Sequence, residues 1–196
     1  MNSKLASSIN GGNTAYERVE SDFYPTPPEV TQALIDFLKI PKHENIWEPA
    51  CGSGHMSRVF LENGYTVVSS DINQTEATDF TCDFTREYYD HECDWIITNP
   101  PFSRAEDFIK SAYDIGIPFA FLLKSQYWHS KKRLSLFRET NPTYILPLTW
   151  RPDFLFKTRG KGAPLMDCIW CVWMLQDEPT QYIPLEKPVL KIGERL

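Results

Sequence analysis

The sequence lacks any apolar run near the roughly 20 residues that a membrane-spanning helix requires. Its first residues also lack the charged and apolar blocks of a secretory signal. Internal repeats and low-complexity segments are absent as well. We therefore expect a cytoplasmic protein with no membrane partner.

The sequence also lacks a cysteine pattern typical of disulfides or zinc. Its five cysteines are an odd number without framework spacing. Cys168 and Cys171 form a CxxC, but within an aromatic run that reads as a strand. Three residues apart on a strand, the two side chains would point to opposite faces. We expect buried thiols here, and the sequence predicts no metal site.

An excess of positive charge is missing too, because the formal net charge is −6. This argues against a protein that coats nucleic acid generally, so any such contact requires a local basic patch. The loop from Trp150 to Pro164 provides one, with four cations: Arg151, Lys157, Arg159 and Lys161. A second basic cluster lies at Lys131, Lys132 and Arg133.

The length of 196 residues and the 42% hydrophobic content fit one globular domain with its own core. Residues 1–20 are polar and predict a flexible arm. Residues 21–176 hold the periodic segments, and the Pro-rich residues 177–196 predict an extended tail. Strands are expected over 45–48, 65–70, 94–98, 118–123, 143–148 and 167–175. Helices are expected over 27–38, 103–115 and 130–139. A further helix is expected after the turn at Gly54, and it continues through Phe60 and Leu61.

This alternation predicts the α/β class, with a single doubly wound, mostly parallel sheet of about seven strands. No helix separates the last two strands, which indicates an antiparallel hairpin at one edge. Capping boxes are expected at two helix starts. One joins Thr26 to Glu29 with Pro27 at the first helical position, and the other joins Ser103 to Glu106.

The stretch from Asp94 to Phe102 combines a buried strand with an abrupt stop. Pro100 and Pro101 donate no backbone hydrogen bonds and cannot continue a central strand. An amide, two prolines and an aromatic ring therefore follow a strand, at the edge where α/β sheets bind ligands. The alternative is a strand that simply ends in a turn.

A glycine-bearing turn, Pro49 to Gly54, links an expected strand to an expected helix, an arrangement that cradles anionic groups. Asp71 follows roughly 20 residues later, the spacing of an acid that binds ribose hydroxyls. Asp83 is a second acid beside an aromatic residue. The alternatives are a glycine that is required only sterically and a solvated aspartate at a strand end.

In this order the motifs resemble the S-adenosylmethionine (SAM)-dependent amino-methyltransferases, specifically the gamma group of adenine-N6 DNA methyltransferases. The resemblance covers residues 22–123. Tyr24 to Pro28 is similar to the N-terminal cofactor motif, and Trp47 to Gly54 to the glycine motif. Asp71 and the pair Asp83-Phe84 match the positions at the ribose and the adenine ring. Asn99-Pro100-Pro101-Phe102 matches the catalytic motif.

The resemblance implies a Rossmann-like class I methyltransferase fold and SAM as cofactor. It implies a catalytic set of Asn99, Pro100, Pro101 and Phe102. The cofactor-binding residues that it implies are Tyr24, Thr26, Glu48, Pro49, Ala50, Gly52, Gly54, Asp71, Ile72, Asp83, Phe84 and Asn99.

The same motif suggests a chemistry. The Asn99 side-chain oxygen and the Pro100 carbonyl would accept the two N–H bonds of an aromatic amine and free its lone pair. Phe102 would stack on a target base rotated out of its helix. The expected substrate is the N6 amine of adenine in nucleic acid, DNA rather than RNA, with little sequence readout because the chain has no room for a recognition domain. The expected substrate contacts are Phe102, Arg151, Lys157, Arg159 and Lys161.

Other substrates stay open at this point, because the catalytic motif specifies a planar nitrogen more firmly than it specifies DNA. RNA, a protein glutamine amide and a small molecule are the alternatives, and the basic loop favours nucleic acid over the last two. A second alternative is a SAM-binding regulatory protein without turnover. The sequence makes no prediction of oligomeric state.

Overall fold

The structure is a computed structural model that describes residues 24–87, 92–154, 164, 166–176 and 178–190. In this part of the chain, eight strands form one sheet in the order β3-β2-β1-β4-β5-β7-β6-β8. The strands are β1 (Asn45–Glu48), β2 (Thr66–Asp71), β3 (Phe80–Thr81), β4 (Trp95–Thr98), β5 (Phe119–Lys124), β6 (Tyr144–Pro147), β7 (Cys168–Trp173) and β8 (Gln181–Tyr182). The helices are α2 (Pro28–Leu38), α3 (His55–Glu62), α4 (Ala105–Ile115) and α5 (Leu134–Glu139), with short 3-10 helices η1 (Ser125–Trp128) and η2 (Lys131–Arg133).

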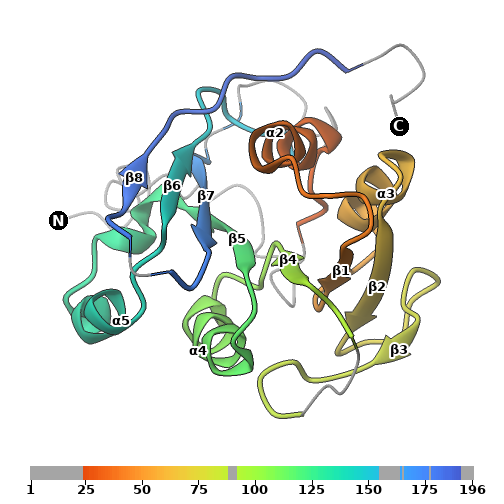
Figure 1. Cartoon of the computed structure of the whole chain (residues 1–196), viewed down its shortest axis with the longest axis horizontal. Coiled ribbons are helices and arrows are strands. Elements are labelled where there is room, and N and C mark those ends of the chain that lie inside the picture. Colours follow the sequence, from red (N-terminus) through yellow and green to blue (C-terminus); the bar gives the residue numbers. More distant parts are fainter. Residues whose placement is uncertain (1–23, 88–91, 155–163, 165, 177, 191–196) are drawn as a thin grey trace, which may run out of the picture.

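Helices cover both faces of the sheet, with α2 and α3 on one face and α4 and α5 on the other (Figure 1). Each face has its own core of buried side chains. The apolar run of β7 is buried throughout, as expected of a strand covered on both sides. Cys168 packs in one core and Cys171 in the other, so the two thiols point to opposite faces as predicted.

Strands β1 to β5 run parallel, and the strand order reverses between β1 and β4. That reversal is the topological switch point at which open α/β sheets bind ligands. β7 is antiparallel to both β5 and β6. The doubly wound, mostly parallel α/β sheet is therefore confirmed. The sheet has eight strands instead of about seven, and β8 lies outside the antiparallel pair, so that pair does not form the edge.

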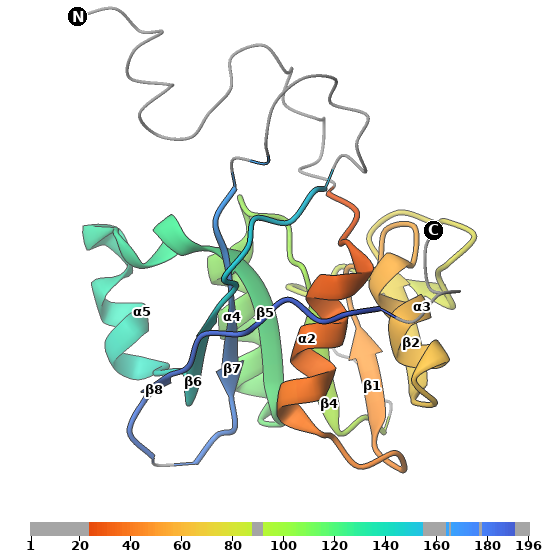
Figure 2. The same ribbon diagram turned by 90° about the horizontal axis from the view of Figure 1, so that it is seen from above.

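Two strands lie outside the six expected ranges: β3, and β8, which comes from the segment expected to be an extended tail. Gln181 and Tyr182 pair in parallel with β6. Leu185 is buried in the core, and Lys187 forms an ion pair with Glu29 of α2 at 3.3 Å. Figures 1 and 2 show this segment running past α2. Two exposed residues in β8 give no apolar alternation, so the sequence pattern does not reveal this strand.

Both predicted capping boxes are wrong, because other contacts use the side chains involved. α2 begins at Pro28 with Pro27 as its cap residue, and Glu29 pairs with the C-terminal segment instead. α4 begins at Ala105, where no side chain caps the helix, and Glu106 pairs with Lys110 at 2.9 Å. The predicted arm over residues 1–20 lies outside the described residues. No helix in the described ranges is long and apolar enough to cross a membrane.

Candidate functional site

A cavity of about 740 Å³ opens at the switch point, between the ends of β1, β2 and β4. This volume falls within the range of pockets that hold drug-sized ligands. The sequence-predicted residues that line it are Tyr24, Thr26, Glu48, Pro49, Ala50, Gly52, Asp71, Ile72, Asp83, Phe84, Asn99 and Pro101.

The turn after β1 forms one wall of the cavity. Gly52 has φ of 53°, a backbone region that side chains disfavour. Its N–H donates to Asp71 Oδ2 at 3.0 Å, and its carbonyl accepts from Thr75 Oγ1 at 2.7 Å. Gly54 does not line the cavity. A Cβ there would meet the Cβ of Ala77 at 2.7 Å, so packing explains this glycine.

Asp71 stands at the end of β2 with a fixed carboxylate. Oδ2 accepts the Gly52 N–H, and Oδ1 accepts the Asn73 N–H at 2.9 Å. Each carboxylate oxygen can accept a further hydrogen bond. The acid therefore presents two oriented acceptors to the cavity, as a pair of neighbouring hydroxyls requires.

Glu48 is the most deeply buried acid of the site, with 2% of its surface exposed. The Ser57 hydroxyl donates to Glu48 Oε2, and Ser57 in turn contacts Ser69 at 2.6 Å. Burial raises the pKa of Glu48 to about 8; the Ser57 hydrogen bonds act in the opposite direction, and the charge of Asp71 adds to the increase. A buried carboxyl of this kind favours a cation in the adjoining cavity.

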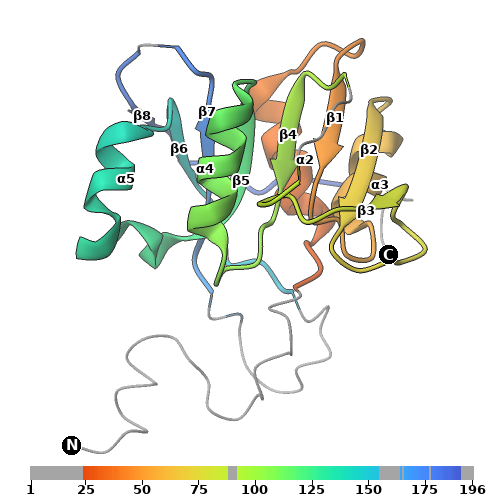
Figure 3. The same cartoon turned by 90° about the horizontal axis from the view of Figure 1, so that it is seen from below.

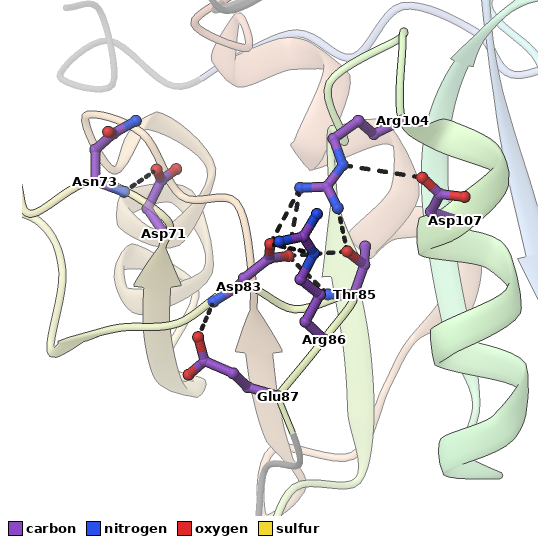
Figure 4. A network of polar contacts seen from close by, with 8 residues as sticks. All are labelled: Asp71, Asn73, Asp83, Thr85, Arg86, Glu87, Arg104 and Asp107. Atoms are coloured by element: carbon purple, nitrogen blue, oxygen red, sulfur yellow. Dashed lines mark hydrogen bonds and ion pairs between the residues drawn. The ribbon is translucent and has the colours of Figure 1, made fainter.

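Asp83 lies within an ionic network that joins the β3 side of the cavity to the start of α4 (Figure 4). Arg104 donates to Asp83 Oδ1 at 3.3 Å and to the Thr85 hydroxyl. Partial burial raises the pKa of Asp83, but the Thr85 hydrogen bonds and the charges of Arg104 and Arg86 outweigh that effect and lower it below its usual value. Arg104 therefore closes the cavity on this side.

The orientation of Asn99 is determined by two contacts from the segment that enters α2. Its side-chain nitrogen donates to the Tyr24 carbonyl at 3.2 Å and to Thr26 Oγ1 at 3.1 Å. Because a carbonyl can only accept, the Tyr24 contact decides which end of the amide faces it. Asn99 Oδ1 is left buried, with no hydrogen-bond partner among the described residues. An unpaired buried acceptor costs about 1–3 kcal/mol, which a donor from a ligand would recover.

An aromatic cluster lies beside this amide. The ring of Phe102 lies 5.6 Å from that of Tyr24, and Tyr24 meets Phe154 edge-on at 6.1 Å. The Lys124 ammonium lies 4.2 Å from the centre of the Phe102 ring. Phe102 is half-buried and does not line the cavity itself. Asn99 itself lines the cavity, and its side-chain nitrogen contacts the backbone of Tyr24, whose ring belongs to this cluster.

The predicted basic loop is brought to the site only in part. Arg151 is exposed, and its Nε pairs with Asp167 at 2.7 Å. Lys157, Arg159 and Lys161 lie outside the described residues. Pro100 is buried and does not line the cavity.

Sequence reasoning missed several residues that line the cavity: Pro25, Cys51, Ser53, His55, Met56, Asn73, Thr75, Cys82, Ser103, Arg104 and Phe108. It also missed Lys124 and Phe154 in the aromatic cluster. The sequence could have indicated Lys124 as a site residue, since it is the only charged residue of β5 and stands at the carboxyl end of that strand. Nothing in the sequence indicates Arg104 as a site residue, because an arginine after a turn is usually solvated.

Comparisons with known proteins agree with the observed topology. No family model matches the chain, and no curated protein sequence matches it. Among solved structures, a protein described as a putative RNA methyltransferase from Pyrococcus horikoshii matches with a TM-score of 0.61 and 15% identity, over 89% of this chain and 99% of that one.

Two further structures share the fold. A modification subunit of a putative type I restriction enzyme from Vibrio vulnificus matches with a TM-score of 0.56 and 13% identity, over 92% of this chain and 49% of that chain, so this chain spans about half of its length. A SAM-dependent O-methyltransferase from Thermotoga maritima matches with a TM-score of 0.55 and 13% identity, over 91% of this chain and 74% of that chain. At these identities the likeness is one of fold, the Rossmann-like sheet of methyltransferases.

Proposed function

We propose that this chain is a SAM-dependent N-methyltransferase that acts on the exocyclic N6 amine of adenine in nucleic acid. The observation that carries the proposal is the buried Oδ1 of Asn99, a cavity-lining residue: this oxygen has no hydrogen-bond partner among the described residues, while the amide nitrogen is held by Tyr24 and Thr26. An amide oxygen in this position accepts an N–H from the group that receives the methyl.

The residues of the cavity fit SAM. Its amino-acid portion carries an ammonium, which suits the buried Glu48 carboxyl. Asp71 would accept from the ribose hydroxyls, with Ile72 and Asp83-Phe84 around the adenine ring. A fold neighbour that is described as a SAM-dependent O-methyltransferase supports this cofactor.

When bound, SAM supplies an electrophilic methyl group on a sulfonium, which departs as S-adenosylhomocysteine (SAH). The chain's own part is positioning. Asn99 Oδ1 and the Pro100 carbonyl accept the two N–H bonds of the amine, which frees the nitrogen lone pair to form the new N–C bond. The two prolines stiffen the loop, so the acceptors need little reorganisation. One N–H proton then passes to water, so no side chain has to act as a base.

The aromatic cluster favours a planar ring as the substrate. Phe102 and Tyr24 offer stacking surface next to the acceptor, and such stacking is typical of proteins that bind unpaired bases. The aliphatic side chain of a glutamine has no ring that could stack on Phe102 and Tyr24. We propose DNA as the preferred nucleic acid, and RNA as the second candidate because one fold neighbour is described as an RNA methyltransferase.

The experiment supplies methyl-labelled SAM to the protein with duplex DNA, single-stranded DNA, RNA and a release factor in parallel. Each product is digested to nucleosides or amino acids before the label is assigned. We expect N6-methyladenine from a DNA substrate. Label in methylglutamine, or SAH binding without transfer to any of the four, contradicts the proposal.

A further inference from the structure

We propose that the segment from Lys124 to Arg133 is the surface that holds the phosphates of a polynucleotide strand beside the aromatic cluster. This inference rests on the function proposed above and identifies where its substrate binds. We call the segment the β5–η2 surface.

The first observation is the charge of this part of the chain. From Gly116 to Arg138 the sequence contains no aspartate or glutamate, although the whole chain has a net charge of −6. The cations in this stretch are Lys124, Lys131, Lys132, Arg133 and Arg138. A run of the chain that carries only positive charge attracts an anionic partner even on an acidic protein.

The second observation is where this charge lies. In the pairing of β4 with β5, Thr98 is opposite Phe121, so Lys124 is level with the loop that carries Phe102. Its ammonium lies 4.2 Å from the centre of that ring and 6.0 Å from the centre of the Tyr24 ring. Figures 2 and 3 show the segment leaving β5, the loop after β4 and the entry to α2 along one edge of the sheet. The β5–η2 surface therefore adjoins the place where a target base would stack.

The third observation is that the cations of this part of the molecule differ in their partners. Lys131 and Lys132 are exposed, and no carboxylate pairs with either of them among the described residues. Arg133 is held in place by the Tyr127 carbonyl at 2.9 Å and by the Tyr127 ring at 4.1 Å. Arg151, by contrast, pairs with Asp167. Lys131 and Lys132 therefore carry charge that no carboxylate of the described residues neutralises.

Phosphate is the anion that suits this arrangement, because lysines act as point charges that bind phosphate without reading bases. Several such contacts along a strand would hold it while its base stacks on Phe102. The inference predicts salt-dependent, sequence-independent binding that adds to the stacking.

The test is the binding of a fluorescein-labelled single-stranded DNA to the full chain with saturating SAH, followed by anisotropy over a salt series. The variants are Lys124→Met and the double variant Lys131→Met/Lys132→Met. The matched control is Lys39→Met/Lys42→Met, which removes two exposed lysines at the opposite edge, between α2 and β1. At about 0.7 per phosphate contact, the slope of log affinity against log salt should flatten by about 1.4 in the double variant and about 0.7 in Lys124→Met. The control should keep the wild-type slope.

A wild-type slope in Lys131→Met/Lys132→Met, or an equal change in the control, overturns the inference. Labelled poly-glutamate that binds as tightly as the labelled DNA also overturns the inference, because it would assign the surface to an acidic protein. SAH affinity, measured by calorimetry on the same samples, separates the two proposals. A chain that binds SAH but no DNA contradicts the surface and leaves the cofactor proposal standing. A chain that binds no SAH contradicts the proposed function, while the DNA slopes still decide the surface.

Discussion

The side-chain nitrogen of Asn99 lies 3.1 Å from the hydroxyl oxygen of Thr26, a residue 73 positions earlier in the chain. This contact ties the loop after β4 to the entry of α2. It also turns the Asn99 oxygen away from Thr26, where the chain offers it no donor among the described residues. The segment before α2 therefore orients the proposed methyl-acceptor site.

We expect Thr26→Val to lower the rate of methyl transfer by about tenfold. The change removes one acceptor that holds the Asn99 amide, and a net hydrogen bond contributes about 0.5–1.5 kcal/mol. Thr26→Ser keeps the hydroxyl and should retain most of the rate. Initial rates with saturating SAM measure the effect, and equal rates for Val and Ser would mean that Thr26 does not orient Asn99.

We expect Asp71→Ala to weaken SAH binding by about 1.5–3 kcal/mol, the contribution of hydrogen bonds to a charged acceptor. Asp71→Asn keeps one oxygen for the Gly52 or Asn73 N–H and should lose less. Calorimetric titration with SAH gives both values. If Asp71→Ala binds SAH like the wild type, Asp71 does not contact the cofactor.

We expect the free energy of unfolding to fall as the pH rises from about 4.5 to about 8, because of Glu48. Its pKa is about 8 in the folded protein against 4.5 for an ordinary glutamate, so the folded state holds the proton more tightly. The contribution of protonated Glu48 to the free energy of unfolding is fully present below pH 4.5. It is lost as the pH rises through 8. The loss is on the order of a few kcal/mol, from about 1.4 kcal/mol per pKa unit.

Urea unfolding of the wild type and Glu48→Gln across this pH range isolates the effect, since other titrating groups are shared. The amide cannot ionise, so the variant should show a flatter profile and should be the more stable protein near pH 8. Parallel profiles would show that the Glu48 pKa is not raised.

A cation bound beside Glu48 favours its ionised form, so SAH binding should also release protons near pH 7.

Much of the fold follows from local pattern. The apolar runs at β1, β2, β4, β5 and β7 predict strands because each is short and bounded by turn residues. The acid Asp71 and the turn at Gly52 are recognisable since their spacing reflects the geometry of a strand followed by a helix. The same reasoning brings most of the predicted cofactor residues to one cavity.

The rest depends on contacts between residues distant in sequence. Thr26 and Glu29 have the spacing of a capping box, but Asn99 and Lys187 use them instead. β8 forms because β6 offers a free edge, which no local pattern in its two residues reveals. The bonds of Arg104 to Asp83 and of Arg151 to Asp167 depend on how long side chains meet across the fold, and their sequence neighbours do not encode this.

The most direct test of the proposed chemistry compares the wild type with Asn99→Ala under saturating methyl-labelled SAM and single-stranded DNA. The products are digested to nucleosides and the label is counted in N6-methyladenine. We expect label in that nucleoside from the wild type and a rate about 10²–10³ lower in the variant, with SAH affinity nearly intact, because the variant loses a preorganised acceptor. A wild-type rate in Asn99→Ala, or no label in N6-methyladenine from the wild type, would contradict the assignment of Asn99 Oδ1 as the acceptor of the reacting amine.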